Sequence, residues 1–224
     1  TAYEIRLSLV GSEMCIRDRD ISVLLGYPRY KVARYLKNYL DEKLMISKYK
    51  DSYSWSLDGK KKAVNFLTLI ELYTFFILRD GGLSTHKIAN ARKEISDTLK
   101  SPYPFANSKV LHDGNSIYYY FKDLMIQVGT KQLPLEKVIE SFAEKIDFSG
   151  DDLASKYWPK GKSSSVVVDP KHQFGQPVIN GTNINIEVIN SMHESGEPES
   201  VIRSLYDLTN KEFNDVIKFY KTAA

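Results

Sequence analysis

The chain has 224 residues, of which 42% are hydrophobic and 26% are charged, and its formal net charge is +3. This composition is close to the globular average and excludes a wholly disordered or fibrous chain. No apolar run approaches the ~20 residues that span a bilayer, and no secretory leader is recognisable, so we expect a cytoplasmic protein. One cysteine and four histidines exclude a disulfide framework and a Cys/His zinc site.

The first 19 residues carry no helix or strand period, and we expect them to be an artefact. The run from Ser12 to Arg19 resembles a translated sequencing adapter, and a natural N-terminal arm is the alternative. This segment holds the only cysteine, Cys15, so the rest of the chain has no thiol for cysteine catalysis. We expect the true N-terminus, with part of the first helix, to be missing.

Charge divides the remaining chain into three parts. Residues 20–62 hold ten basic and five acidic residues, a net charge of +5, whereas residues 63–165 carry +1 and residues 166–224 carry −3. A basic front predicts a polyanionic partner there, and a solvated face without a partner is the alternative. The expected domains are a DNA-binding domain at 20–109, a connecting region at 110–162 and a C-terminal domain at 163–224.

Residues 20–39 show the pattern of a helix-turn-helix. Gly26 ends a first short helix, and Pro28 suits the start of a second helix that runs from Arg29 to Tyr39. Basic and aromatic side chains away from the core face of this second helix are suited to the major groove of DNA. A plain helical hairpin with a solvated basic face is the alternative. The candidate DNA-binding residues on this helix are Arg29, Tyr30, Lys31, Arg34, Tyr35 and Lys37.

Two alternating stretches, Leu44–Tyr49 and Tyr53–Leu57, predict a short β-hairpin. Asp58-Gly59 is a turn signal. A hairpin with lysines near its tip is typical of a wing that contacts the DNA backbone. A lysine run at a loop is usually only solvated, so it gains weight here from the neighbouring helix-turn-helix. The lysines in question are Lys60, Lys61 and Lys62.

The middle of the chain predicts helical core followed by small strands. Apolar side chains from Phe66 to Ile77 recur at helical spacing, and Ser84 or Thr85 can cap a second helix that ends near Leu99. We assign this aromatic stripe to packing. The later expected elements are strands at Ser116–Phe121 and Leu124–Val128, a helix at Pro134–Lys145 and a polar linker at Gly161–Ser165.

The last 60 residues predict two short strands and three helices. The helices are expected at Ile186–Glu194, at Glu199–Tyr206 and after a capping box formed by Thr209 and Glu212. On the middle helix we expect Val201, Ile202 and Leu205 to point inward. The predicted fold class is therefore mainly α with small β elements: a winged helix-turn-helix followed by a three-helix, helix-turn-helix-like unit.

The order of motifs in the front half resembles the MerR-like DNA-binding head of one class of bacterial antitoxins. The resemblance rests on the helix-turn-helix, the wing and the runs Phe66–Leu72 and Gly82–Ile88. The later runs Tyr103–Ala106, Asp113-Gly114 and Tyr157–Pro159 also resemble the connecting region of those proteins. Each motif is weak alone, and their order carries the resemblance.

The tail is similar to a small antitoxin domain known as domain of unknown function 433. Two positions depart from its pattern: Phe174 stands where glycine is frequent, and Asn183 stands where arginine is frequent. Any role of that arginine is therefore not carried over. The main motif positions are Asp169, Pro170, Gly175, Pro177, Gly181 and Thr182, and the match continues through Ile184, Gly196, Tyr206, Leu208 and Thr209.

Over residues 20–220 the chain thus resembles VapB-type antitoxins. The resemblance implies a homodimer that silences a PIN-like ribonuclease toxin and represses its own operon by binding duplex promoter DNA. The residues alone indicate two different partners, because the head is basic and the tail is acidic. A stand-alone MerR-like transcriptional regulator, with a C-terminal dimerisation or ligand-sensing domain, is the alternative.

We expect no enzymatic activity, no cofactor and no metal site. The sequence has no Gly-rich phosphate loop, and no histidine has a second histidine three or four residues away. Asp151 and Asp152 are adjacent and would point apart on any regular element, which disfavours a metal pair. The isolated histidines are His86, His112, His172 and His193.

Overall fold

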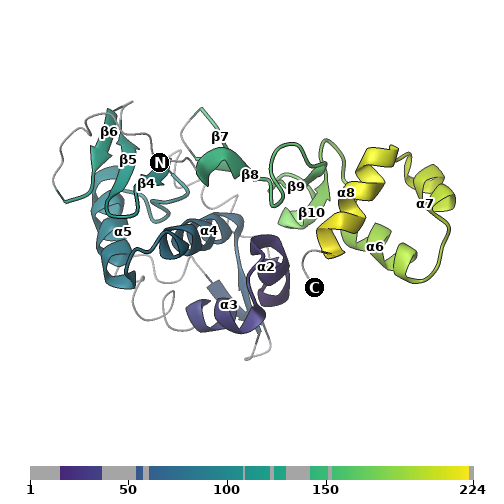
Figure 1. The fold of residues 1–224 in the computed structure, drawn as a ribbon, viewed down its shortest axis with the longest axis horizontal. Coiled ribbons are helices and arrows are strands. Elements are labelled where there is room, and N and C mark those ends of the chain that lie inside the picture. The colour runs from purple at the N-terminus through teal and green to yellow at the C-terminus, as the bar shows by residue number, and fades with distance from the viewer. Residues whose placement is uncertain are drawn as a thin grey trace.

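A computed structural model describes residues 16–36, 54–57, 61–107, 109–121, 124–129, 142–150 and 153–221. Within these ranges the chain forms seven α-helices and ten β-strands (Figure 1). The helices are α2 (Asp18–Leu25), α3 (Arg29–Tyr35), α4 (Phe66–Asp80), α5 (Thr85–Leu99), α6 (Ile186–Glu194), α7 (Glu199–Tyr206) and α8 (Asn210–Lys221).

The strands form three antiparallel sheets, with the orders β1-β3-β2, β4-β5-β6 and β10-β9-β8-β7. Their bounds are β1 (Ile16–Arg17), β2 (Ser54–Leu57), β3 (Lys61–Val64), β4 (Val110–His112), β5 (Ile117–Phe121), β6 (Leu124–Gln127), β7 (Ile146–Phe148), β8 (Ala154–Tyr157), β9 (Val166–Val168) and β10 (Pro177–Ile179).

The prediction of a mainly α fold is therefore wrong, because the fold mixes helices with three sheets. The strands that the sequence did not reveal are short. β4 and β7 have three residues each and β8 has four, too few for an alternating pattern to stand out from a loop. Their identity as strands depends on partners that are distant in sequence, which local periodicity does not encode.

Two helices form on either side of Gly26 and Pro28, where the glycine and proline signals predict a turn. The second, α3, is described from Arg29 to Tyr35, whereas the sequence predicts it to Tyr39; residues 37–39 lie outside the described part of the chain. Gly26 adopts the left-handed conformation, with φ of 71°, and its N–H donates to the Ser22 carbonyl at 3.0 Å. An L-residue with a side chain would be strained at this φ, which explains the glycine. Pro28 then occupies the N-cap position of α3. Helices α2 and α3, which this turn joins, pack against each other.

The head sheet places two residues of the expected N-terminal artefact next to the core. Ile16 pairs with Val64 and Arg17 with Ala63, so β1 extends the sheet at β3. The Ile16 side chain is fully buried. These two residues thus complete a three-stranded sheet beside the helix-turn-helix.

The hairpin expected as a wing is built from a different pair of strands. β2 pairs with β3, with Leu57 opposite Lys61 and Ser56 opposite Lys62. The turn signal at Asp58-Gly59 thus lies between these two strands, and two of the three lysines belong to the returning strand. The stretch Leu44–Tyr49, expected as the partner strand, lies outside the described residues.

Helix α4 is the central element of the core. Every side chain from Phe66 to Phe76 is buried, including the polar residues Thr68, Glu71 and Thr74. Asn65 caps its first turn by accepting from the Thr68 N–H at 2.8 Å. Helix α5 begins in the same way, because the Ser84 hydroxyl accepts from the Lys87 N–H at 3.2 Å. Both capping side chains satisfy backbone donors that a helix start leaves free.

The middle sheet confirms the two strands expected in the connecting region. β5 and β6 form the predicted pair, and Tyr119 in β5 lies opposite Ile126 in β6. Of the helix expected at Pro134–Lys145, the structure describes only the end, where Phe142–Lys145 forms a single turn of 3-10 helix. The rest of that segment lies outside the described residues.

The four-stranded sheet joins the connecting region to the C-terminal unit. β7 and β8 come from the connecting region and β9 and β10 from the tail, and Tyr157 pairs with Val168 at the junction. The tyrosine hydroxyl donates to the Leu24 carbonyl of α2 at 3.3 Å, and its ring lies 5.0 Å from that of Tyr73 in α4. One strand therefore connects the tail sheet with the helix-turn-helix.

The polar linker expected at Gly161–Ser165 is held by side chains on both sides. Lys162 forms an ion pair with Asp147 of β7 at 2.6 Å. On the tail side, Asp215 accepts from the Ser165 N–H at 2.8 Å. Burial acts to raise the pKa of Asp215, but hydrogen bonds from Lys211 and Ser165 outweigh it and lower the pKa below its ordinary value. The linker thus lies across the boundary in a defined conformation.

The three tail helices confirm the bounds expected from sequence. Thr209 and Glu212 form the predicted capping box: the Glu212 carboxylate accepts from the Thr209 N–H at 2.8 Å, and the Thr209 hydroxyl accepts from the Glu212 N–H at 3.2 Å. The inward assignment on α7 is correct for Ile202, which is fully buried. It is wrong for Val201 and Leu205, which are 48% and 64% exposed.

Candidate nucleic-acid interface

The exposed face of α3 carries three of the candidate DNA-binding residues. Arg29, Tyr30 and Arg34 are all exposed, and Tyr30 is the most exposed large hydrophobic side chain among the described residues, at 75%. Tyr30 and Arg34 stand one turn apart and therefore share a face of the helix. Arginine guanidinium groups are among those that read guanine edges in the major groove, so this face of α3 is the candidate DNA-reading surface.

Tyr35 belongs to the core, which corrects its assignment as a DNA-binding residue that points away from it. Its side chain is 5% exposed. The ring packs edge-on against Phe75 at 4.9 Å and Phe76 at 4.8 Å between centroids. Its contribution is to seat α3 on α4, and it is not available to DNA in this arrangement.

Lys31 is half-buried and already has partners within the head. Its Nζ lies 4.4 Å from the centroid of the Tyr27 ring and 3.6 Å from a carboxylate oxygen of Asp80. The Tyr27 ring in turn stacks on Phe76 at 4.4 Å, and its hydroxyl donates to Asp80. Burial, together with the nearby Asp80 carboxylate, raises the pKa of the Tyr27 phenol, so this hydroxyl stays protonated.

The cluster of Tyr27, Lys31 and Asp80 fixes the turn between α2 and α3 to the end of α4. This cluster is not predicted from the sequence, because Tyr27 and Asp80 are 53 positions apart and no local pattern joins them. The signal that could have found it is the aromatic residue directly before Pro28, since a helix start often has such a side chain packed against a neighbouring element.

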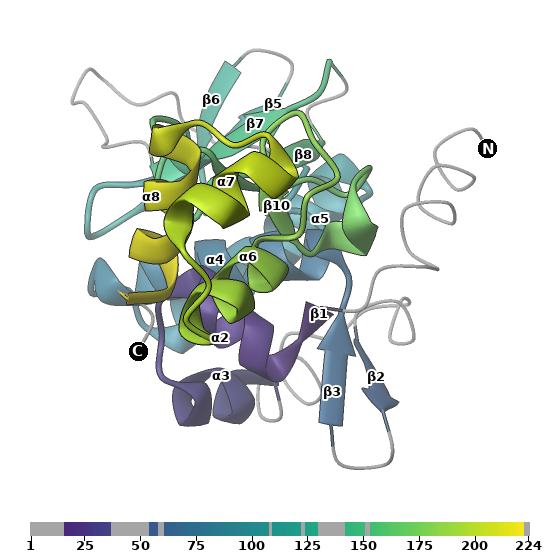
Figure 2. The ribbon, with the colours of Figure 1, turned by 90° about the vertical axis from the view of Figure 1, so that its right-hand side faces the viewer.

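In Figure 2 the hairpin β2–β3 and helix α3 both lie in the lower part of the molecule. Lys61 and Lys62 belong to β3, so their backbone is part of this hairpin. Lys37 and Lys60 lie outside the described residues. The candidate interface therefore combines the exposed side chains of Arg29, Tyr30 and Arg34 on α3 with a hairpin whose returning strand contains Lys61 and Lys62.

The sequence motif of the tail builds turns. Asp169 is buried, accepts from the Lys171 N–H at 2.9 Å and lies 3.3 Å from the Lys156 ammonium of β8. Thr182 folds back on β10, because its hydroxyl donates to the Ile179 carbonyl at 2.9 Å. The other motif positions follow the same logic: Gly175 and Gly181 have positive φ of 77° and 79°, Pro170 lies in the turn after Asp169, and Pro177 begins β10.

Asn183, which departs from the expected arginine, contacts His172 at 2.6 Å through its side-chain oxygen. The same histidine lies 3.9 Å from Asp169. This small polar group therefore connects the two turns of the tail motif. Among the described residues, no group of three or more histidine, cysteine, aspartate or glutamate side chains is arranged to hold a metal ion.

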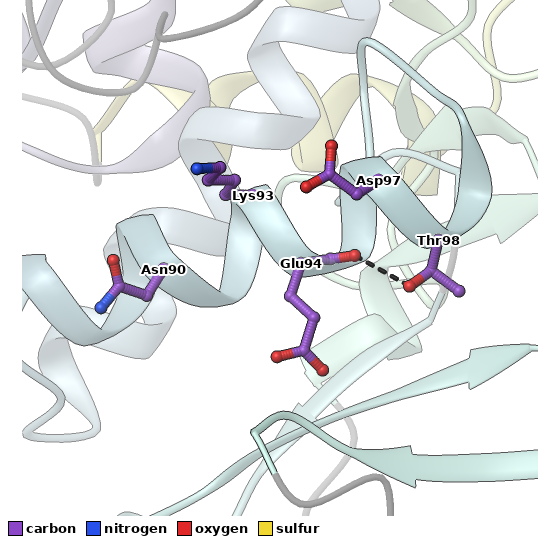
Figure 3. Close-up of a pocket in the computed structure, with 5 residues that line it drawn as sticks. All are labelled: Asn90, Lys93, Glu94, Asp97 and Thr98. Carbon is purple, nitrogen blue, oxygen red and sulfur yellow. Dashed lines mark hydrogen bonds between the residues drawn. The ribbon is translucent and has the colours of Figure 1, made fainter.

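A shallow hollow lies on the exposed side of α5 (Figure 3). Its side chains all come from this one helix, and they carry both signs of charge. In Figure 3 Glu94 and Asp97 point in different directions, and the Glu94 carboxylate accepts from the Gly129 N–H at 3.0 Å. This arrangement brings no nucleophile and base together. The lining residues are Asn90, Lys93, Glu94, Asp97 and Thr98.

In the part of the chain that the structure describes, no helix is both long and apolar enough to cross a bilayer.

The sequence of the tail matches a known protein family. Residues 166–220 match a family described as "Protein of unknown function (DUF433)". The predicted resemblance of the tail to this domain is therefore confirmed, over the segment from β9 to the last turn of α8.

A curated protein and a solved structure, both from Mycobacterium tuberculosis, resemble this chain beyond its tail. "Putative antitoxin VapB45" of strain ATCC 25618 / H37Rv is 22% identical over 175 residues, which cover 71% of this chain and 72% of that protein. The solved structure titled "X-ray crystal structure of Rv2018 from Mycobacterium tuberculosis" has a TM-score of 0.63 at 17% identity. The structural match covers 89% of this chain and 95% of the solved chain, so the two proteins share a fold. The MerR-like character of the head stays a prediction.

Proposed function

We propose that this protein is the antitoxin of a type II toxin–antitoxin pair. In this proposal it has no catalytic activity: the head binds the promoter of its own operon as a cytoplasmic homodimer, and the tail binds and silences a PIN-like ribonuclease toxin. The observation that carries the proposal is the exposed Arg29–Tyr30–Arg34 face of α3, on a chain that is similar to a named antitoxin over 71% of its length.

The charge distribution supports two separate partners. Residues 20–62 carry +5, which favours binding to a polyanion such as duplex DNA. Residues 166–224 carry −3 and hold the tail motif, whose described residues build turns. A basic and an acidic region on one chain suit nucleic acid at one end and protein at the other.

A nuclease assay tests the toxin half of the proposal. The neighbouring gene product is expressed alone and assayed for cleavage of a labelled RNA in Mg²⁺, and this protein is then added in steps. We expect cleavage to stop near a one-to-one ratio. Continued cleavage at a tenfold excess would remove the antitoxin assignment.

A stand-alone transcriptional regulator is the second candidate, and one contact favours it. Tyr157 links the tail sheet to the Leu24 carbonyl at the end of α2, so a change in the tail could be transmitted to the helix-turn-helix. If the neighbouring gene encodes no nuclease and a small molecule changes DNA affinity, this candidate replaces the antitoxin.

The wing provides a prediction about affinity without specificity. Replacing Lys60, Lys61 and Lys62 together by alanine should weaken binding to promoter and unrelated duplexes alike, because lysines neutralise phosphates irrespective of sequence. The slope of log K against log salt should become shallower by about 0.9 for each phosphate that the variant no longer neutralises. Fluorescence anisotropy at two salt concentrations measures both effects, and an unchanged slope would exclude the wing from the interface.

A further inference from the structure

The tail exposes apolar side chains that a helix of a closed domain would bury. Among the described residues five large hydrophobic side chains are exposed, and three of them lie on α6 and α7. Val188 is 45% exposed, Val201 is 48% exposed and Leu205 is 64% exposed. Val201 and Leu205 stand one turn apart on the same face of α7, and α6 contacts α7. We name the surface that carries Val201 and Leu205 on α7, together with Val188 on the contacting helix α6, the α6–α7 face.

The same segment is strongly acidic. Residues 186–207 hold five carboxylates and one arginine, a net charge of −4. The arginine is already engaged, because Arg203 lies 3.4 Å from the Glu199 carboxylate and also donates to the Leu208 carbonyl. Glu187, next to Val188 in the sequence, and Glu197, four residues before Val201, are both exposed. A segment that is apolar and acidic repels the phosphates of duplex DNA.

We propose that the α6–α7 face is the docking surface for a protein partner whose own surface is apolar at the centre and basic at the rim. This rests on the proposed function, because we identify the partner with the ribonuclease toxin. RNA is a polyanion, so an enzyme that cleaves it presents a basic surface to its substrate. A partner docked on the α6–α7 face through that basic surface cannot hold RNA there, which makes the docking contact itself inhibitory.

A second copy of this chain is a poorer occupant. A twofold dimer places the same patch on both sides, so two acidic rims would meet across the interface. Opposite charges at a rim favour association, and like charges oppose it. In Figure 1 the helices α6 and α7 lie at the opposite end of the molecule from the β4-β5-β6 sheet, and α3 lies between these ends, so we expect DNA and the partner to bind together.

The apolar centre is tested with the Val201→Ser/Leu205→Ser double variant of the full chain. Both side chains are exposed, so the melting temperature should stay unchanged, whereas affinity for the co-expressed nuclease should fall about 10- to 100-fold because central apolar anchors dominate interface energy. Isothermal titration calorimetry measures the affinity. Tyr30→Ser is the matched control: it removes an exposed apolar side chain from α3 and should weaken DNA binding only.

The acidic rim is tested with Glu187→Lys/Glu197→Lys. Association with the nuclease should slow by about 10-fold at low salt, and the difference from the wild type should shrink as salt rises, because rim charges act on the encounter rate. Asp97→Lys on α5 reverses an exposed carboxylate elsewhere and should leave the rate unchanged.

The outcomes separate the two proposals. If the wild type neither binds nor inhibits the nuclease, the proposed function fails and the docking face fails with it. If the wild type binds and the serine variant binds equally well, the docking face is wrong while the antitoxin assignment stands. If the serine variant instead converts a dimer into a monomer in sedimentation velocity, with nuclease binding retained, a second copy covers this face.

Discussion

Replacing Glu71 by alanine should be among the most destabilising single changes in this protein, by about 3–5 kcal/mol, because it leaves a buried guanidinium without its counter-ion. Glu71 of α4 and Arg92 of α5 are 4% and 6% exposed, and their side chains are 2.7 Å apart. Urea unfolding followed by circular dichroism measures the loss. Glu94→Ala on the solvent side of α5 is the control and should cost far less.

The loss is large because Glu71 also holds a loop. One carboxylate oxygen accepts from the N–H groups of Phe105 at 2.6 Å and Ala106 at 3.2 Å, while Arg92 donates to the Pro102 carbonyl at 2.8 Å. Burial raises the pKa of Glu71, against the lowering effects of Arg92 and of the two backbone donors. The pair therefore fixes α4, α5 and the loop between α5 and β4 in one arrangement.

A second variant separates the ion pair from the loop contacts. Glu71→Leu/Arg92→Leu removes both charges and should recover part of the stability, because two matched apolar side chains avoid the cost of desolvating ions. Recovery should be incomplete, since the Phe105 and Ala106 N–H groups lose their acceptor. If Glu71→Ala lowers the free energy of unfolding by less than about 1 kcal/mol, the buried ion pair does not stabilise the protein as described here.

The second large effect is expected on operator recognition. Arg29→Ala/Arg34→Ala should remove most of the preference for the chain's own promoter, at about 1–3 kcal/mol for each arginine that is bidentate to guanine. Binding to unrelated duplexes should fall much less, because only the charge term is lost there. Anisotropy titrations with promoter and scrambled duplexes give the ratio of the two affinities.

Two further variants sharpen this result. Arg34→Lys keeps the charge but not the planar fork, so it should lose specificity nearly as much as alanine does. Lys93→Ala removes an exposed positive charge on α5, away from α3, and should leave the affinity ratio unchanged. If the double alanine variant keeps the wild-type ratio, α3 does not read the operator.

The sequence predicts the helix bounds of the tail well, because the signals there are local. Asn185 before α6, Pro198 before α7 and the Thr209–Glu212 box before α8 each act within four residues of the helix that they start. Gly26 is equally local, since its left-handed conformation ends α2 without help from distant residues.

The errors arise where two faces of a helix are both apolar. Helix α7 has one apolar stripe at Ile202 and Tyr206 and a second at Val201 and Leu205. Because α7 packs on α6 and α8 through the first stripe, the second stays exposed. Tyr35 is the opposite case. It stands three residues after the buried Val32, so helical spacing already places it on the core face.

The sheets depend on pairs that no local pattern specifies. The junction of Tyr157 with Val168 brings together strands on either side of the linker, and β1 reaches β3 across the whole helix-turn-helix. The connection between head and tail is therefore a property of the folded chain that sequence reasoning did not anticipate.

The most direct test of the account is a native gel shift with a labelled duplex from the chain's own upstream region. We expect this protein to retard that duplex at salt concentrations where a scrambled duplex stays free. Adding the neighbouring nuclease should then give a second, slower band that contains all three components. A duplex that remains free with this protein, or a nuclease that never joins the retarded band, would contradict the two-partner account.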